Sequence, residues 1–403
     1  MPRSAHKARF GTLVAGLSIV LVRFVAAAPF TAGNVIVATA PSSGLQQAAI
    51  TVAEYAPAFG AAVQAYTIPA SGTPPIGSTE NTAITAMQIA FPDDNNQQLY
   101  VATTWTNVSS GSRRAGFLRV SAAGPTLAAD EAFENGVGAV LCRGVAAAGG
   151  YVFTSTGSGS ARNVGAMSEL YFSGNARWIE AFGGQLYVSS SGSLAPFSGP
   201  GIYKTGLADS APAVLSKLFP VGLDGALPLG FAVTDANTIY VAVHVDGGGL
   251  VAGLYKWTFG GGVWTAQGRR NTMTEAISDV DVAVSGTTVT LYAISDTSVW
   301  KLTDTLASTG SAWTDAPAAT VLTGLSRGRA IAVVPGAGVP VCSCAGDLVP
   351  DQKVNGNDIE AFVRCLLGGP GPCDCGDFNN SGGVTVADIG PFVSRLLTFT
   401  TCS

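Results

Sequence analysis

Short apolar segments alternate with polar turns along most of the chain. Six of these segments begin at residues 86, 139, 176, 228, 279 and 328, and they read from AMQIAF in the first to GRAIAVV in the last. Each of the first five is followed by a small polar or glycine turn. A second apolar run with an aromatic residue near its start comes next, such as LYVATTW from Leu99. Two such runs across a tight turn predict a β-hairpin.

The hairpins repeat about every 50 residues, and several continue into weaker outer strands, a pattern typical of a β-propeller. The sixth segment meets Pro335 and Gly336 instead of a partner strand, whereas the runs at 34–40, 48–57 and 61–69 have no inner strand before them. We therefore predict an all-β, six-bladed propeller whose last blade is closed by the N-terminal strands. Seven blades result if the long first unit is split. A β-sandwich or two smaller all-β domains is the alternative.

The chain begins with a basic stretch, a 12-residue apolar run from Gly11 to Val22, and the small residues of FVAAAP. This order is typical of a cleavable signal peptide, which we assign to residues 1–27. The alternative is an uncleaved anchor or a buried helix. No later apolar run is long enough for a membrane helix, so we expect no transmembrane span after cleavage. The protein is therefore expected to be secreted, extracellular or attached to a cell surface.

Composition narrows the function classes. Charged residues make up 12% of the chain, the formal net charge is −5 and the sequence pI is about 5.1. A nucleic-acid-binding protein needs a basic face, so no nucleic-acid partner is expected. Disorder is also excluded, because disordered chains are rich in charge and poor in apolar residues. The six tryptophans could stack on a carbohydrate, but most lie within strand patterns, where packing between blades is expected.

A Gly- and Pro-rich stretch near residue 336 separates two regions of different composition. We predict a propeller over 28–335, a linker over 336–341 and a small domain over 342–403. Six of the seven cysteines fall in that last domain. In an exported segment this indicates disulfides, although zinc is the competing interpretation. The remaining cysteine, Cys142, is expected to be a buried apolar residue.

The C-terminal domain contains a duplication with an offset of 30 residues, from GDLVPDQKVNGNDIEAFVRCLL at Gly346 to GDFNNSGGVTVADIGPFVSRLL at Gly376. Each copy is a loop with oxygen-bearing side chains followed by apolar residues at helical spacing. The loop positions match those of a 12-residue calcium loop. The predicted ligands are Asp347, Asp351, Lys353 (through its carbonyl), Asn355 and Asp358, and then Asp377, Asn379, Ser381, Gly383 (through its carbonyl), Thr385 and Asp388.

Two Ca²⁺ sites are therefore predicted, and the site from Asp377 to Asp388 is expected to be the stronger. In the first loop Val349 offers no ligand oxygen at its position, and Gln352 replaces the glycine of the sharp turn. A domain this small has little core of its own, so metal and disulfides are expected to stabilise it. The alternative is a pair of acidic loops that never bind metal.

These duplicated loops and helices resemble a type I dockerin domain over about residues 346–398. The resemblance implies two bound calcium ions and docking to a cohesin-like partner, with a link to polysaccharide degradation. The chain departs from the family pattern at Gly356-Asn357 and Val386-Ala387, where dockerins often carry a Ser-Thr pair. The N-terminal region resembles secreted bacterial β-propellers in architecture only.

The sequence favours a binding protein over an enzyme and assigns no catalytic residue. The mature chain would hold one histidine, His244, on a predicted strand with Asp246, and no nucleophile motif accompanies them. Carboxylates such as Glu54, Glu180 and Asp279 are expected to be solvated turn and rim residues. The alternative function is a secreted polysaccharide-degrading enzyme, a glycoside hydrolase or lyase, tethered by the dockerin-like tail.

Overall fold

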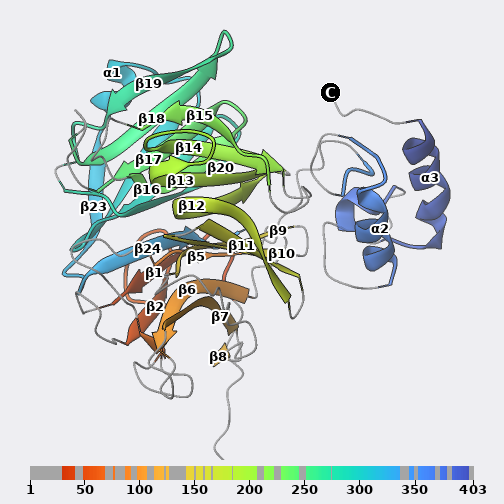
Figure 1. The fold of residues 1–403 in the computed structure, drawn as a ribbon, viewed down its shortest axis with the longest axis horizontal. Helices are drawn as coiled ribbons and strands as arrows, with labels where there is room; N and C mark the ends of the chain where they lie inside the picture. The colour runs from red at the N-terminus through yellow and green to blue at the C-terminus, as the bar shows by residue number, and fades with distance from the viewer. Residues whose placement is uncertain are drawn as a thin grey trace, which may run out of the picture.

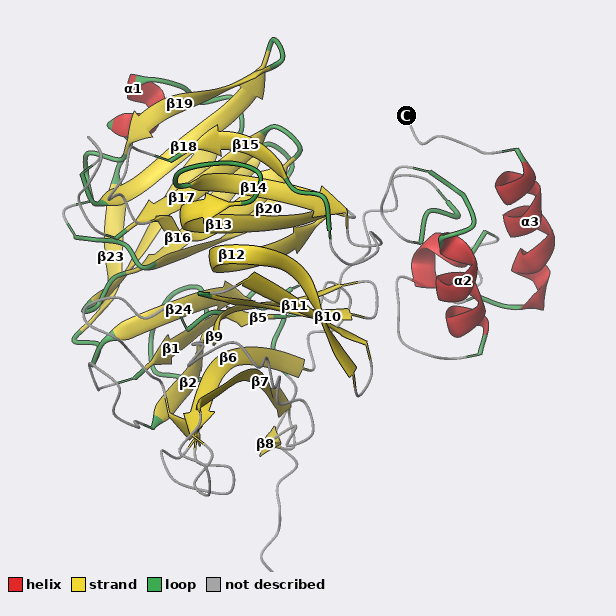
Figure 2. Ribbon diagram, viewed as in Figure 1, coloured by secondary structure: helices red, strands yellow, loops and turns green. Residues whose placement is uncertain are grey.

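The computed structural model describes twenty segments of the chain. They are residues 30–40, 49–68, 76–77, 87–91, 98–106, 113–121, 124–126, 142–148, 151–157, 159–164, 167–183, 185–206, 213–221, 228–244, 251–273, 275–335, 345–348, 353–367, 373–378 and 384–398. The predicted signal peptide and linker lie outside these segments. Strands dominate up to residue 333, and the helices longer than one turn follow after residue 357 (Figures 1 and 2). No helix within these segments is long and apolar enough to cross a membrane.

One sheet joins the two ends of the β region, as the unpaired sixth segment predicts. Its strand order is β24 (Gly328–Val333), β1 (Val35–Thr39), β2 (Ile50–Tyr55) and β3 (Gln64–Ile68). β24 runs antiparallel to β1 and places Ile331 opposite Val37. The predicted closure by N-terminal strands is confirmed. It pairs an edge of β24 that would otherwise be open to another chain.

Two further four-stranded sheets follow the predicted repeat units closely. The first is β16 (Pro228–Asp235), β17 (Thr238–Val243), β18 (Gly253–Gly260) and β19 (Val263–Arg269). The second is β20 (Asp279–Ser285), β21 (Thr288–Ile294), β22 (Ser298–Thr305) and β23 (Ala318–Thr323), with the short helix α1 (Ser311–Thr314) before β23. In the first sheet β17 is buried along its whole length, whereas no residue of the outer strand β19 is buried. Burial on both faces explains why the inner runs are almost continuously apolar.

A five-stranded sheet and a seven-stranded sheet hold the remaining strands. The five-stranded sheet contains β4 (Ile76–Gly77), β5 (Ile89–Ala90), β6 (Gln98–Thr106), β7 (Arg113–Ser121) and β8 (Gly124–Thr126). The seven-stranded sheet contains β9 (Cys142–Ala148), β10 (Tyr151–Thr156), β11 (Gly159–Val164), β12 (Met167–Phe182), β13 (Gln185–Leu194), β14 (Gly201–Gly206) and β15 (Ser216–Pro220).

The arrangement is propeller-like, but the prediction of six or seven separate blades is wrong. Among the described residues, four sheets have the four or five strands of a blade, and the fifth sheet has seven. The physical reason is β12, whose 16 residues run without a break through two of the units that the sequence repeat separates. Its first part pairs with β11 up to Ser173, and its second part pairs with β13 from Gly174 onward.

The innermost strands form a closed ring. β5, β9, β12, β16, β20 and β24 each contact the next, and β24 contacts β5. A large buried cluster extends across several sheets, with Ile36 from β1, Trp178 from β12 and Val241 from β17 among its members. Trp178, Trp257, Trp300 and Trp313 are all buried, so these indoles pack in the interior, as expected. The mean hydropathy of the chain is +0.35, and this positive value reflects the packing of apolar strands in the interior.

The C-terminal region contains the two helices that the duplication predicts. They are α2 (Asp358–Leu366) and α3 (Ile389–Leu397), with single 3₁₀ turns at η1 (Cys373–Gly376) and η2 (Val386–Asp388). Phe362 and Phe392, which occupy equivalent positions in the two copies, stack with ring centroids 4.0 Å apart. Leu348, Val354, Cys365 and Cys375 complete this small core.

The described cysteines of both regions lie in buried cores. Cys142 on β9 is buried, as expected, and Cys365 and Cys375 lie in the small C-terminal core. The full pairing of the six C-terminal cysteines stays a prediction.

Candidate functional site

The second predicted calcium loop ends on a buried carboxylate. Asp388 is completely buried at the start of α3. Its Oδ1 accepts a hydrogen bond from the Phe378 backbone N–H at 2.8 Å, and its Oδ2 accepts from the Thr385 backbone N–H at 2.9 Å. The Thr385 hydroxyl also donates to Oδ2 and in turn accepts from the Ala387 backbone N–H, which completes a capping box. The carboxylate therefore holds the two ends of the loop together.

The first loop repeats this arrangement at an offset of 30 residues. Asp358 is completely buried at the start of α2, and its Oδ2 accepts from the Asn355 backbone N–H at 2.8 Å. Asn355 Oδ1 accepts from the Asn357 backbone N–H at 2.8 Å. Asp347, at the beginning of the loop, is 1% exposed. The duplication read from the sequence is thus repeated in the hydrogen bonding of the fold.

The structure describes seven of the eleven predicted ligands. Asp347, Lys353, Asn355, Asp358, Asp377, Thr385 and Asp388 lie in described segments, and Asp351, Asn379, Ser381 and Gly383 lie outside them. Within the described segments no three acidic, histidine or cysteine side chains come together as a metal site. The oxygen-rich, carboxylate-containing donor set fits a hard cation such as Ca²⁺, and the two calcium sites stay a prediction.

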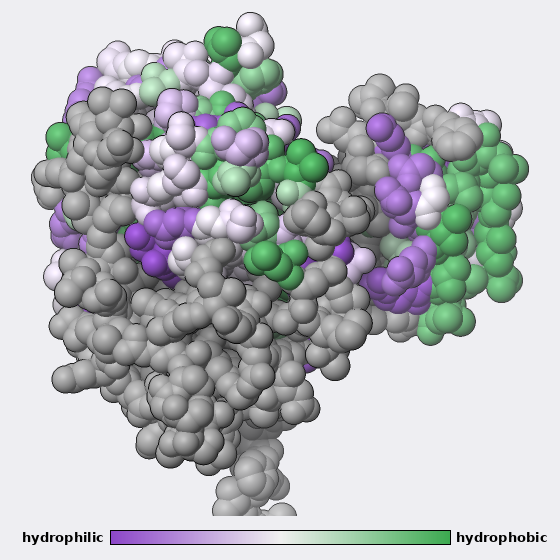
Figure 3. All heavy atoms as spheres, in the orientation of Figure 1, coloured by the Kyte–Doolittle hydropathy of each residue, from purple (hydrophilic) through white to green (hydrophobic). Residues whose placement is uncertain are grey.

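Both C-terminal helices expose an apolar face. Ile359 and Val363 on α2 are 43% and 44% exposed, and Ile389 and Val393 at the equivalent positions on α3 are 39% and 41% exposed. Each face continues into a leucine after the second turn, with Leu367 at 80% and Leu397 at 73%. Figure 3 shows this apolar surface in green over α2 and α3. Sequence periodicity predicted amphipathic helices but could not show that part of the apolar side stays uncovered.

Several acidic residues in the described part of the β region are structural acceptors, which corrects the expectation that Glu54, Glu180 and Asp279 are solvated. Glu54 is completely buried and accepts hydrogen bonds from the Thr31 backbone N–H and the Asn34 side chain. Glu180 on β12 accepts from the Val233 backbone N–H of β16. A carboxylate on one inner strand thus satisfies a backbone donor on the next, as buried polar groups require.

Two aspartates on β20 continue this pattern toward the closing sheet. Asp279 Oδ2 accepts from the Ile331 backbone N–H at 3.0 Å, and Asp281 Oδ2 accepts from the Val333 backbone N–H at 2.6 Å. Burial raises the pKa of Asp281 to about 6 and raises that of Asp279 well above its usual value. The hydrogen bonds to the backbone oppose this shift without cancelling it. Both carboxylates thus connect β20 to β24.

His244 lies at the end of β17 beside Ser278, with 3.2 Å between Nδ1 and the hydroxyl oxygen. Burial lowers the pKa of the imidazole, and Arg329 and Arg327 add to the effect while Asp296 opposes it. Ser278 is 3% exposed, so a substrate could not approach its hydroxyl without rearrangement. Asp246 lies outside the described residues. These contacts give no basis for a catalytic assignment.

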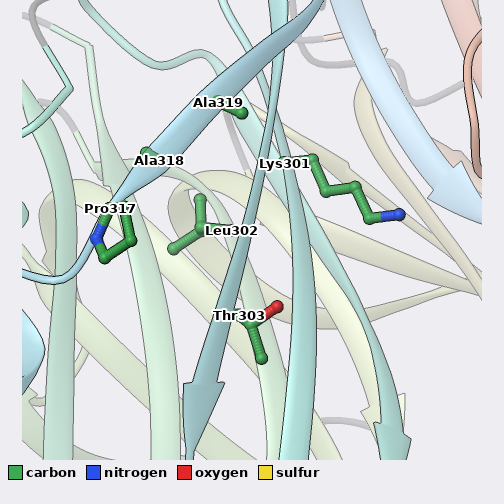
Figure 4. Close-up of a pocket in the computed structure, with 6 residues that line it drawn as sticks. All are labelled: Lys301, Leu302, Thr303, Pro317, Ala318 and Ala319. Atoms are coloured by element: carbon green, nitrogen blue, oxygen red, sulfur yellow. The ribbon is translucent and has the colours of Figure 1, made fainter.

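A pocket of about 320 Å³ lies against β22 and β23 (Figure 4). Its lining residues are Lys301, Leu302, Thr303, Pro317, Ala318 and Ala319. The ammonium group of Lys301 donates to the backbone carbonyl of Pro57 at 3.1 Å and so already has a partner. None of these six residues is acidic or a histidine, so they supply no carboxylate or imidazole for acid–base chemistry.

No family model matches this chain, and no curated protein matches it. Solved structures that match this chain include a chain of a nidogen/laminin complex, at 16% identity with a TM-score of 0.44, covering 74% of this chain and 97% of that one. Apo AztD from Citrobacter koseri gives 11% identity and a TM-score of 0.33, covering 74% and 97%. The extracellular domain of BT4673 from B. thetaiotaomicron gives 12% and 0.39, covering 73% and 34%. The dockerin resemblance receives no support from these comparisons.

Proposed function

We propose that this chain is an exported, non-catalytic binding or surface protein. In this proposal the propeller-like region recognises a ligand, with a carbohydrate as one candidate. The C-terminal repeat, loaded with Ca²⁺, attaches the chain to a cohesin-like or cell-surface protein. The observation that carries the proposal is the pair of exposed apolar faces on α2 and α3, which recur at equivalent positions of the two copies.

These faces have the character of a protein-binding surface. Exposed branched side chains at Ile359, Val363, Ile389 and Val393 recur at helical spacing on the two helices. Contiguous exposed apolar surface is uncommon on soluble proteins and marks interaction sites. Hydrophobic side chains on a rigid helix also lose little conformational freedom on binding, which favours affinity.

Calcium supports the same proposal through the loops that precede the helices. Asp358 and Asp388 are buried carboxylates in a domain with a small core, and a buried charge is unfavourable without compensation. Ca²⁺ would supply that compensating charge and cross-link the loop oxygens. Asp347 and Asp358 would hold one ion, and Asp377 and Asp388 would hold the other. In each loop the carboxylate at the helix start would couple ion binding to helix position.

A docking experiment on the full mature chain tests this proposal. Purified cohesin modules are immobilised, and binding is measured with calcium and again with excess EDTA. We expect binding that is micromolar or tighter in calcium and at least tenfold weaker in EDTA. The double substitution Val363→Asp with Val393→Asp should abolish it, because charges would be buried at the interface.

The matched control is Val263→Asp, which places the same charge on an exposed valine of β19 and should leave binding unchanged. Calorimetry on the same samples should give two calcium ions per chain in the wild type and one after Asp377→Ala with Asp388→Ala. Calcium binding without docking to any module would contradict the cohesin-like partner alone. Absence of calcium binding would contradict the loop assignment.

A further inference from the structure

A buried polar cluster lies between the sheet of β16 to β19 and the sheet of β20 to β23. Tyr240 comes from β17, Lys256 from β18 and Asp304 from β22, and Arg270 follows directly after β19. Lys256 and Arg270 are both completely buried, and Asp304 is 4% exposed. Charged side chains are almost never buried to this extent unless they are paired.

One half of the cluster is fully paired. Lys256 Nζ donates to Asp304 Oδ2 at 2.8 Å and to the backbone carbonyls of Thr305 at 2.8 Å and Ser308 at 2.9 Å. Tyr240 donates its hydroxyl to Asp304 Oδ2 at 2.6 Å, and the Ser308 hydroxyl donates to Asp304 Oδ1. The lysine and the aspartate therefore cancel in charge, and their polar atoms are satisfied by one another and by the backbone.

The other half is Arg270, and it is not paired. Among the residues that the structure describes, none of its three guanidinium nitrogens has a hydrogen-bond partner. Its guanidinium carbon lies 4.0 Å from the ring centroid of Trp313, whose own N–H donates to the carbonyl of Gly268. The cation–π contact lowers the cost of the charge but supplies no acceptor for the N–H groups.

Arg270 therefore lacks both a counter-charge of its own and hydrogen-bond acceptors for its N–H groups. Arginine keeps its proton in proteins, so Arg270 carries a full positive charge. Among the described residues, Asp304 is the only carboxylate that acts on Arg270, and Asp304 is already bound by Lys256, so the guanidinium has no carboxylate of its own in this desolvated interface. Uncharged acceptors such as buried waters would satisfy donors without balancing that charge. An anion does both.

We propose that Arg270 binds a small inorganic anion of the size of chloride at this interface between the two sheets. The complete burial of Arg270 excludes a large or organic anion. The site would be occupied as the sheets come together, because both flanking sheets cover it in the folded chain. The anion therefore acts as a structural ligand, and it stabilises the folded state in proportion to its concentration. This inference is independent of the proposed calcium-dependent docking.

Thermal unfolding of the full mature chain tests the site. Samples are prepared in sodium chloride or sodium gluconate at equal ionic strength and equal calcium concentration, since gluconate is too large for a buried site. We expect the wild-type Tm to be higher in chloride by at least about 3 °C, a shift that saturable binding to the folded state alone would produce. Arg270→Met should remove the difference between the two salts.

The matched control is Arg269→Met, because Arg269 is adjacent but its Nη1 already donates to the carbonyl of Ala252. This variant should keep the chloride effect. Should Arg270→Met fail to fold, the wild type can be crystallised in bromide, which replaces chloride. An anomalous scattering peak next to Arg270 would then support the proposed site. Equal Tm values in the two salts, a chloride effect retained in Arg270→Met, or water alone beside the guanidinium would each overturn the proposal.

Discussion

Single side chains connect neighbouring inner strands of this fold. The free edge of an inner strand presents backbone N–H groups that need acceptors, and acidic side chains of the preceding strand supply them. Asp281 is the clearest case, because its two oxygens accept from Val333 on β24 and from Val282 on its own strand. Such contacts give the sparse acidic residues of the β region a structural role.

Asp281 makes stability depend on pH in a defined direction. Burial raises its folded-state pKa to about 6, against about 4 when unfolded, so between these values the folded chain keeps a proton that the unfolded chain releases. Its contribution to stability is therefore complete below about pH 4 and is lost as the pH rises to about 6. In this range we expect Asp281→Asn to make the free energy of unfolding less dependent on pH, by a slope that corresponds to at most one proton. Urea unfolding of both proteins at several pH values measures this.

Asp235→Asn provides the comparison for that experiment, because this residue also lies on an inner strand but is followed by a tight turn. This variant should keep the loss of stability that Asp281 causes between about pH 4 and pH 6. An unchanged pH profile in Asp281→Asn would show that its carboxyl group titrates alike in the folded and unfolded states.

At the scale of elements, β12 decides the shape of the largest sheet. It changes partner between Ser173 and Gly174, and Gly174 adopts a φ of 124°, a backbone conformation that side chains rarely allow. A Cβ atom there would lie 2.6 Å from Leu194 Cδ2 and 2.9 Å from the carbonyl oxygen of Ser193. The glycine therefore allows one strand to serve two halves of the sheet.

Gly174→Ala should accordingly destabilise the fold by about 1–3 kcal/mol through strain and steric conflict. Denaturant unfolding measures the loss. Gly260→Ala is the control, because a Cβ at that position meets nothing within 4 Å and its φ is ordinary. Its effect should stay within about 0.5 kcal/mol. Equal costs for the two variants would show that the change of partner does not depend on a glycine.

Among the elements of the fold, sequence patterns predict the hairpins but not the continuity of β12. Hairpins such as β16–β17 and β20–β21 follow directly from apolar runs and turn residues, because both are local properties. The continuity of β12 is different, since Asn175 and the residues around it form a polar break that reads as the boundary between two units. Only the pairing of this segment with β11 and β13 extends it into a single strand.

At the scale of the whole molecule, closure links residues that are about 300 positions apart. β1 is sandwiched between β2 and β24, so neither the N-terminal strands nor the last inner strand completes a sheet alone. Bringing such distant segments together costs chain entropy, which the packing of the inner ring must offset. The ring is therefore expected to form as one cooperative unit.

Removal of residues 28–68 should leave β24 without its partner and abolish cooperative unfolding. Size-exclusion chromatography should show self-association through the exposed edge, and calorimetry should show no sharp transition. Removal of residues 342–403 is the control and should preserve the main transition, because the described residues of this range contribute no strand to the five sheets. A sharp transition and a monomeric state in the N-terminal deletion would contradict the closed-ring description.

The sequence by itself determined the strand-rich body, its closure by both ends, and the duplicated C-terminal helices with their loop carboxylates. Periodicity, turn residues and repeats are properties of short sequence segments, so each can be recognised before the fold is known. Tertiary structure alone decided that β12 merges two units and that acidic residues join inner strands. It also decided that Arg270 is buried with no hydrogen-bond partner among the described residues, and that the helical faces at Val363 and Val393 remain uncovered. These features depend on which distant groups meet, and no local pattern records that.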